Sequence, residues 1–137
     1  MSVHFSSAKQ DWATPDGLYE RLNNVYRFDL DVAASEENAR CADYFTQSAD
    51  GLAQSWEGRR VWCNPPYGRQ LGDWVRKANE EARRAILIVM LVPARTDTVW
   101  WHTAVTCARV EFLRGRLRFK GATNSAPFPS ALLYWNT

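Results

Sequence analysis

The residues whose types and spacing best suit chemistry are Asn64, Pro65, Pro66 and Tyr67, which directly follow a short apolar segment. Two consecutive prolines cannot donate to a β-ladder, so sheet pairing must end there. The four residues form either a rigid turn or a site in which a polar side chain is held in one orientation. Because the preceding segment, 60–63, is typical of a strand, and ligands bind at strand ends in α/β proteins, the context favours a site.

Other kinds of site find less support in the sequence. The three cysteines, Cys41, Cys63 and Cys107, are an odd number without CxxC spacing, and the two histidines lie far apart. These counts argue against a disulfide framework, a zinc site and a histidine-based triad, and we expect no metal. Cys63 is not expected to act as a nucleophile, because no basic partner is evident near it.

Composition predicts one globular domain, since the chain has 137 residues, of which 46% are hydrophobic and 23% charged. The longest apolar run, residues 85–94, is shorter than the roughly 20 residues that cross a bilayer, so we expect neither a membrane span nor secretion. Residues 1–57 carry ten acids and four bases, whereas residues 58–137 carry five acids and thirteen bases. The basic half suits phosphate contacts, and the acidic half suits a cationic ligand or a solvated helical face.

Helices and strands are expected to alternate and so to position these residues. After a polar arm at residues 1–13, the expected helices are one opened by Thr14-Pro15 and ending near Tyr26, a short one opened by Ser35, one over 71–85 and one from Thr96 to about Cys107. The expected strands are 28–32, 60–63, 86–92 and 110–113, followed by two β segments between 116 and 135. This order predicts a single-domain α/β fold with a mostly parallel sheet, helices on both faces and an antiparallel C-terminal hairpin.

Three polar segments follow strands of the predicted sheet. They are Asp31, the Asn64 turn and Pro93-Ala94-Arg95. Since the carboxyl ends of parallel strands meet at one edge, we expect these segments to converge on one crevice.

The Asn64-Pro65-Pro66-Tyr67 segment resembles the (D/N)PP(Y/F) signature of amino-group methyltransferases that use S-adenosylmethionine. Further matching segments are FDLDVAAS, VWCNPPYG, LVPARTDTVWW, RGRLRFKG and APFPSALL. From about residue 11 to 135 the chain is similar to the phage-type Dam DNA N6-adenine methyltransferase family. The resemblance implies a compact Rossmann-like methyltransferase fold, S-adenosylmethionine as cofactor, an adenine flipped from duplex DNA as substrate, and a phage- or prophage-encoded protein in the bacterial cytoplasm that evades host restriction.

The resemblance also implies catalytic roles. The Asn64 side-chain oxygen and the Pro65 carbonyl would accept the two N–H hydrogens of the adenine amino group and so localise the nitrogen lone pair. Pro66 would help to hold these acceptors rigid, which is a form of preorganisation. Tyr67 would stack on the flipped base, and no general base is expected.

The same resemblance places six residues around the cofactor: Trp12, Thr14, Pro15, Asp31, Ala33 and Asp50. Thr14-Pro15 would open a helix whose N–H groups bind the cofactor carboxylate, with plain capping as the alternative. Asp31 and Ala33 resemble the DPxCGxG cofactor loop without its glycines. Asp50 would approach the cofactor adenine amine, with a simple turn as the alternative, and Trp12 would form a wall.

Five basic residues are expected to contact DNA: Arg95, Arg114, Arg116, Arg118 and Lys120. The last four alternate along the predicted hairpin, which would put their charges on one face to grip phosphates. The alternative is a solvated edge strand protected by charge.

We divide the domain into a cofactor-binding half, 14–57, and a catalytic and DNA-binding half, 58–137. Little chain remains for target recognition, so we expect short or relaxed sequence specificity. The alternatives are methylation of RNA or a protein amide, or a catalytically silent nucleic-acid-binding relative. The glycine-poor cofactor loop favours the silent relative.

Overall fold

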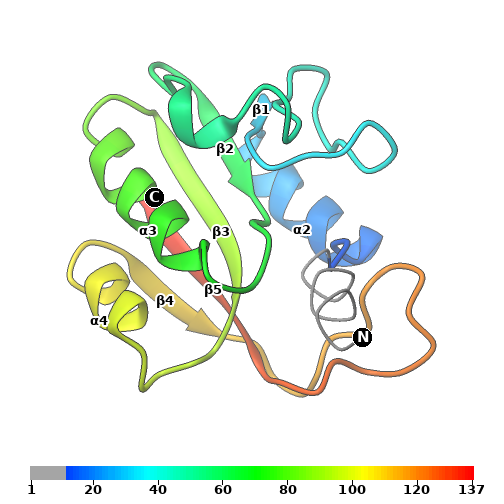
Figure 1. The fold of residues 1–137 in the computed structure, drawn as a ribbon. Helices are drawn as coiled ribbons and strands as arrows, with labels where there is room; N and C mark the ends of the chain where they lie inside the picture. Colours follow the sequence, from blue (N-terminus) through cyan, green and yellow to red (C-terminus); the bar gives the residue numbers. More distant parts are fainter. Residues whose placement is uncertain (1–11) are drawn as a thin grey trace.

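The computed structural model describes residues 12–137, so most of the polar arm predicted at 1–13 lies outside the described residues. The described chain forms one mixed α/β domain (Figure 1). Its elements are α2 (Asp16–Tyr26), β1 (Leu30–Asp31), the 3₁₀ helix η1 (Gly51–Ala53), β2 (Arg60–Cys63), α3 (Leu71–Glu81), β3 (Leu87–Pro93), α4 (Val99–Val105), β4 (Arg109–Phe112) and β5 (Ser130–Trp135). No helix within this part of the chain is long and apolar enough to cross a membrane.

The five strands form one mixed sheet in the order β1-β2-β3-β5-β4. β1, β2 and β3 pair in parallel, whereas β5 pairs antiparallel with both β3 and β4. The sheet is therefore mixed, with two parallel and two antiparallel pairings, and the predicted mostly parallel sheet is found only on the β1–β3 side. The cause is that the wholly buried β5 inserts between β3 and β4.

The predicted C-terminal hairpin is wrong in its first strand, which does not form. Residues 113–129 contain no strand, and the antiparallel neighbours of β5 are β3 and β4. The chain leaves the sheet after Leu113, whose N–H donates to the Ser130 carbonyl, and turns through Gly115 and Gly121 at φ of 74° and 84°. These left-handed values favour glycine and break an extended strand.

Other boundaries follow local hydrogen bonds. The helix predicted over 14–26 is confirmed as α2, but no helix forms at Ser35, where residues 36–38 form turns. α4 begins after Thr98 rather than Thr96, because the Thr98 hydroxyl accepts from the Trp101 N–H at 3.2 Å and caps the helix. The strand over 60–63 is confirmed, and the apolar run becomes β3, which is buried throughout.

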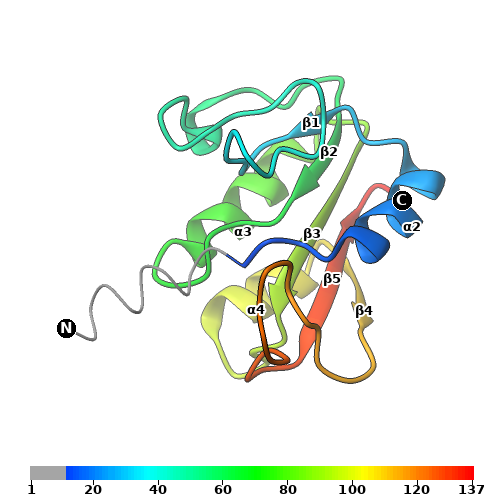
Figure 2. The ribbon, with the colours of Figure 1, turned by 90° about the vertical axis from the view of Figure 1, so that its right-hand side faces the viewer.

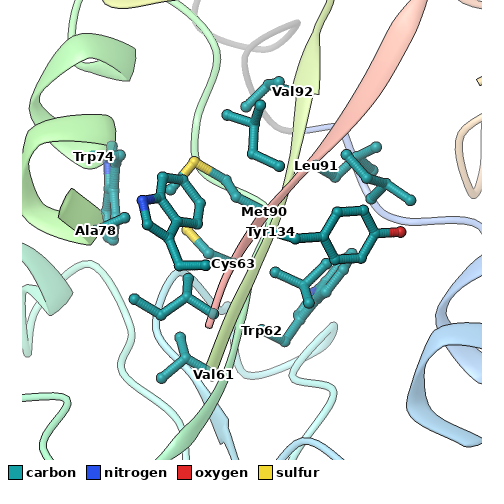
Figure 3. Packing of buried hydrophobic residues seen from close by; sticks show 14 of the residues in the cluster. Val61, Trp62, Cys63, Trp74, Ala78, Met90, Leu91, Val92 and Tyr134 are labelled. Carbon is teal, nitrogen blue, oxygen red and sulfur yellow. The ribbon is translucent and has the colours of Figure 1, made fainter. Parts of the chain in front are cut away.

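Side chains alternate between the two faces of the sheet, as the pleat requires. Trp62 packs toward α2, where its ring lies 5.5 Å from that of Tyr19. Val61 and Cys63 point to the opposite side, toward Trp74 of α3 (Figure 3). Two views show α2 on one side of the sheet and α3 with α4 on the other (Figures 1 and 2). Helices thus cover both faces and leave the ends of the strands for a site.

Candidate active site

The carboxyl ends of β1 and β2 lie side by side, because Asp31 is in register with Trp62. A cleft of about 1040 Å³ opens at these ends. It is lined by residues of the segments 12–14, 31–40, 46–52 and 62–66, together with Gln70 and Trp74. The cleft joins two of the three predicted strand ends, since Asp31 and Asn64 line it whereas the end of β3 does not.

Asn64 follows β2, and its side-chain carboxamide is hydrogen-bonded through its nitrogen and not through its oxygen among the described residues. Its Nδ2 donates to the Trp12 carbonyl and to the Thr14 hydroxyl, the latter at 3.0 Å. Its Oδ1 is buried and has no hydrogen-bond partner among the described residues. A buried acceptor without a donor costs about 1–3 kcal/mol, so this oxygen is suited to receive a hydrogen bond from a ligand.

Asp31 ends β1 and is only 3% exposed. Its carboxylate accepts the backbone N–H of Ala33 at 3.3 Å and that of Arg40 at 3.0 Å, which closes the loop between them. Burial raises the pKa of Asp31 to about 6, while these two hydrogen bonds and the Arg40 charge act in the opposite direction. The loop therefore encloses a carboxyl group that a cation would help to ionise.

Arg40 ties this loop to the segment before α2. Its guanidinium donates to the Thr14 carbonyl and to Asp16 Oδ1, the latter at 2.8 Å, and lies 5.3 Å from the centre of the Tyr19 ring. The sequence reasoning missed Arg40. The one available signal was its position as one of four bases in an acidic half.

η1 forms the far wall of the cleft. Asp50 has φ of 60° and its side chain accepts from the Leu52 N–H, so it caps η1 as the turn reading predicted, and it also lines the cleft. Gly51 packs so closely on the residue that follows β1 that a Cβ would lie 2.0 Å from the Val32 carbonyl oxygen. A glycine is therefore required where η1 meets the loop after β1.

The lining of the cleft is acidic. Four carboxylate side chains, Asp31, Glu36, Glu37 and Asp50, face one basic side chain, Arg40. The Arg40 guanidinium is already paired with Asp16. Electrostatics therefore favour a ligand that carries positive charge.

Three of the four remaining residues predicted to bind the cofactor lie in the cleft. Trp12, Thr14 and Ala33 line the cleft, and Pro15 does not. Pro15 is the N-cap of α2 and no side chain caps this helix, so the reading of Thr14 as a cap is wrong. The Thr14 hydroxyl bonds Asn64 instead.

Tyr67 is the member of its motif that does not line the cleft. Its ring is 3% exposed, its hydroxyl donates to the Leu91 carbonyl at 3.2 Å, and burial raises its pKa well above the usual value. The ring packs in T-shaped contacts on Phe119 and Phe128, at 6.3 and 5.7 Å between centroids. In this arrangement Tyr67 shapes the aromatic cluster beside Asn64 and offers no open face.

The five predicted DNA contacts are all exposed, but the four expected to alternate along a strand, Arg114, Arg116, Arg118 and Lys120, lie in a loop. Arg118 donates to the carbonyls of Ala122 and Thr123, and Lys120 lies 3.4 Å from Asp16. The Lys120 N–H donates to the Ala13 carbonyl, which seats this loop beside the segment before α2 (Figure 2). The loop that carries Lys120 thus meets the lining of the cleft at Ala13, whereas the alternation that would put the four charges on one face is not found.

Comparison with known proteins shows the family to which this chain belongs. The family model described as DNA N-6-adenine-methyltransferase (Dam) matches residues 2–133. The chain is 39% identical over 95 residues to a DNA N-6-adenine-methyltransferase of Escherichia phage T1, covering 68% of this chain and 40% of that protein. It is 30% identical over 105 residues to a DNA N-6-adenine-methyltransferase of Haemophilus phage HP1, covering 75% and 61%. The matches thus span less than two thirds of each relative, but the family model covers nearly the whole chain, which belongs to the DNA N-6-adenine-methyltransferase (Dam) family.

Proposed function

We propose that this protein transfers a methyl group from S-adenosylmethionine to the exocyclic N6 of adenine in DNA. The observation that carries the proposal is the Asn64 Oδ1, a buried acceptor without a partner among the described residues, at the end of β2 beside the cleft. Membership of the family adds the substrate class, because both phage relatives are named for this activity.

The cleft has room for a molecule of the cofactor's class, and its charge suits the proposed cofactor. Its volume is about 1040 Å³, and its four acids against one base suit a molecule with a sulfonium and an ammonium group. The buried Trp74 Nε1 also lacks a partner among the described residues, so the lining retains a donor as well as an acceptor. Asp31, Asp50, Ala33, Thr14 and Trp12 would hold the cofactor, with Pro15 opening α2 behind them. When bound, it supplies an electrophilic methyl group.

The residues of the chain act on the adenine amino group. Its lone pair is delocalised into the ring, which makes it a poor nucleophile. Asn64 Oδ1 and the Pro65 carbonyl would accept its two N–H hydrogens and localise the lone pair, with Pro66 holding the backbone rigid. The Asn64 carboxamide is held by its hydrogen bonds to Trp12 and Thr14 before a substrate arrives, so little reorganisation of this acceptor would oppose the reaction.

The same proposal assigns the DNA side. The exposed Arg95, Arg114, Arg116, Arg118 and Lys120 would contact phosphates around the cleft, and Tyr67 would support the pocket for the flipped base. Residues 14–57 would then form the cofactor-binding half and residues 58–137 the catalytic and DNA-binding half of a Rossmann-like methyltransferase domain. The parallel pair β1 and β2, with the cleft at its carboxyl ends, supports this division, because one strand comes from each half. The bacterial cytoplasm would be the place of action.

The test is incubation of the purified protein with unmethylated DNA and methyl-tritiated S-adenosylmethionine, followed by chromatography of the nucleosides. We expect label in N6-methyladenine and a roughly thousandfold lower turnover in Asn64→Ala, with cofactor affinity unchanged within about twofold. Asn24→Ala, an exposed change on α2, is the matched control and should behave as the wild type.

Label in RNA or protein instead of DNA would refute the proposed substrate. Full turnover in Asn64→Ala would refute the proposed role of Asn64. Defined duplexes also test specificity: a required recognition sequence of six or more base pairs would contradict the expectation of short or relaxed specificity.

A further inference from the structure

The Asn64 carboxamide has two unlike ends, and only one of them suits the proposed reaction. If the carboxamide oxygen faces the adenine amino group, it can accept a hydrogen bond from it. If the carboxamide NH₂ group faced the amino group, two hydrogen-bond donors would meet and no hydrogen bond would form. The Trp12 carbonyl is an acceptor only, so the nitrogen must face it. The second amide hydrogen goes to the Thr14 hydroxyl at 3.0 Å, and the oxygen is thereby turned away from both.

The Thr14 hydroxyl is available to bind Asn64 because it does not cap α2. It is 3% exposed and directly precedes Pro15, where a threonine would ordinarily cap the following helix. Here α2 has no side-chain cap, and the described hydrogen bond of the Thr14 hydroxyl is with Asn64, 50 residues along the chain.

The Thr14 backbone is in turn held by Arg40. The guanidinium donates to the Thr14 carbonyl and to Asp16, and its side chain is 16% exposed. The Arg40 N–H is bound by the Asp31 carboxylate. One set of contacts therefore runs from the loop after β1 to the amide after β2.

We infer that Thr14 is a positioning residue that orients the Asn64 carboxamide, with Arg40 fixing Thr14 in place. This inference rests on the proposed function and reassigns the Thr14 hydroxyl from the cofactor to the catalytic amide. Thr14 acts through Asn64 and is not required to touch the substrate.

The first test separates turnover from cofactor affinity. Thr14→Val replaces the hydroxyl by a methyl group of similar size and should lower kcat about tenfold, with the dissociation constant for S-adenosylmethionine unchanged within about twofold. Thr14→Ser restores the hydroxyl and should restore most of the turnover. Thr103→Val makes the same chemical change within α4, where the hydroxyl bonds only to the Val99 carbonyl in the described structure, and should leave kcat unchanged.

The opposite split would overturn the inference: weaker cofactor binding in Thr14→Val at unchanged kcat would make the hydroxyl a cofactor ligand. Unchanged kcat and affinity would also overturn it. A double substitution adds a further condition, because Thr14→Val should cost nothing more in an Asn64→Ala background if it acts through Asn64.

The second test needs no methyl transfer and so remains valid if the proposed function fails. The side-chain NH₂ signals of Asn64 can be identified by NMR as those absent from Asn64→Ala. In Thr14→Val one of the two hydrogens loses its acceptor, so its chemical shift should move and its exchange with solvent should speed up. Spectra identical to those of the wild type would refute the orienting contact, whatever the activity of the protein.

Discussion

Asp31 should link the stability of the fold to pH in the direction opposite to that of most carboxylates. Burial raises its pKa from 3.8 to about 6, so between these values the unfolded chain releases the proton while the folded chain keeps it. Stability is therefore lost as pH rises through this window and stays low above it. At 1.36 kcal/mol per pKa unit, the difference between 3.8 and about 6 corresponds to about 3 kcal/mol.

Asp31→Asn isolates this effect because the amide does not titrate. The substitution also carries a constant cost, since one carboxamide oxygen cannot accept from both the Ala33 and Arg40 N–H groups as the carboxylate does. That cost is the same at every pH. We therefore expect the free energy of unfolding of Asp31→Asn, minus that of the wild type, to increase by about 2 kcal/mol from about pH 4.5 to 7.

Urea unfolding followed by tryptophan fluorescence measures this difference directly. The control is Asp16→Asn. Arg40 and Lys120 lower the pKa of Asp16 below its usual value of 3.8, so Asp16 is ionised in both the folded and the unfolded chain above about pH 4.5, and the corresponding difference should stay nearly flat from about pH 4.5 to 7. A difference for Asp31→Asn that stays flat or falls over this range would refute the reasoning, since no buried carboxyl with a raised pKa could then be present.

Three further predictions concern the cleft and its rim. Affinity for S-adenosylmethionine should be about tenfold weaker at about pH 5 than at about pH 7 by calorimetry if the ionised Asp31 binds it, and equal affinities would argue against that role. Gly51→Ala should destabilise the fold by about 3 kcal/mol in thermal unfolding, because its Cβ would lie 2.0 Å from a backbone oxygen. Gly17→Ala, whose Cβ meets nothing within 4 Å, should instead be neutral or stabilising, and equal effects of the two changes would contradict the close approach. Replacing Arg114 and Arg116 by alanine should weaken DNA binding and reduce its salt slope by about 1 per phosphate contact, whereas an unchanged slope would remove them from the interface.

The parts of the fold that could be predicted are those fixed by local physics. The apolar run of β3, short and rich in β-branched residues, is typical of a strand buried inside a sheet, and the spacing of Leu71, Trp74, Val75 and Ala78 gives α3 its buried face. Two prolines after β2 end the strand whatever surrounds it. These signals suffice to place Asn64 at a strand end, and the structure adds that this end lies next to that of β1.

The segment 113–129 shows where local pattern misleads. The segment has basic residues at alternate positions, as a strand would: Arg114, Arg116, Arg118 and Lys120. In a polar segment, however, this alternation does not determine which strand it would pair with. Positive φ at Gly115 and contacts with the distant Ala13 decide the outcome as a loop. The charged side chains remain exposed although the predicted strand is absent, so their contact with DNA is still a proposal.

The chemistry of the site depends most on contacts that no local pattern encodes. A threonine before a proline predicts a helix cap from short-range physics alone, yet the Thr14 hydroxyl bonds an amide 50 residues away. An arginine at the end of a turn-rich loop carries no sequence signal that its guanidinium will bond a carbonyl 26 residues earlier. The sequence can name Asn64 as the amide proposed to accept a hydrogen from the substrate, but which end of its carboxamide is left without a partner is decided by Trp12 and Thr14, which only the folded chain brings to it.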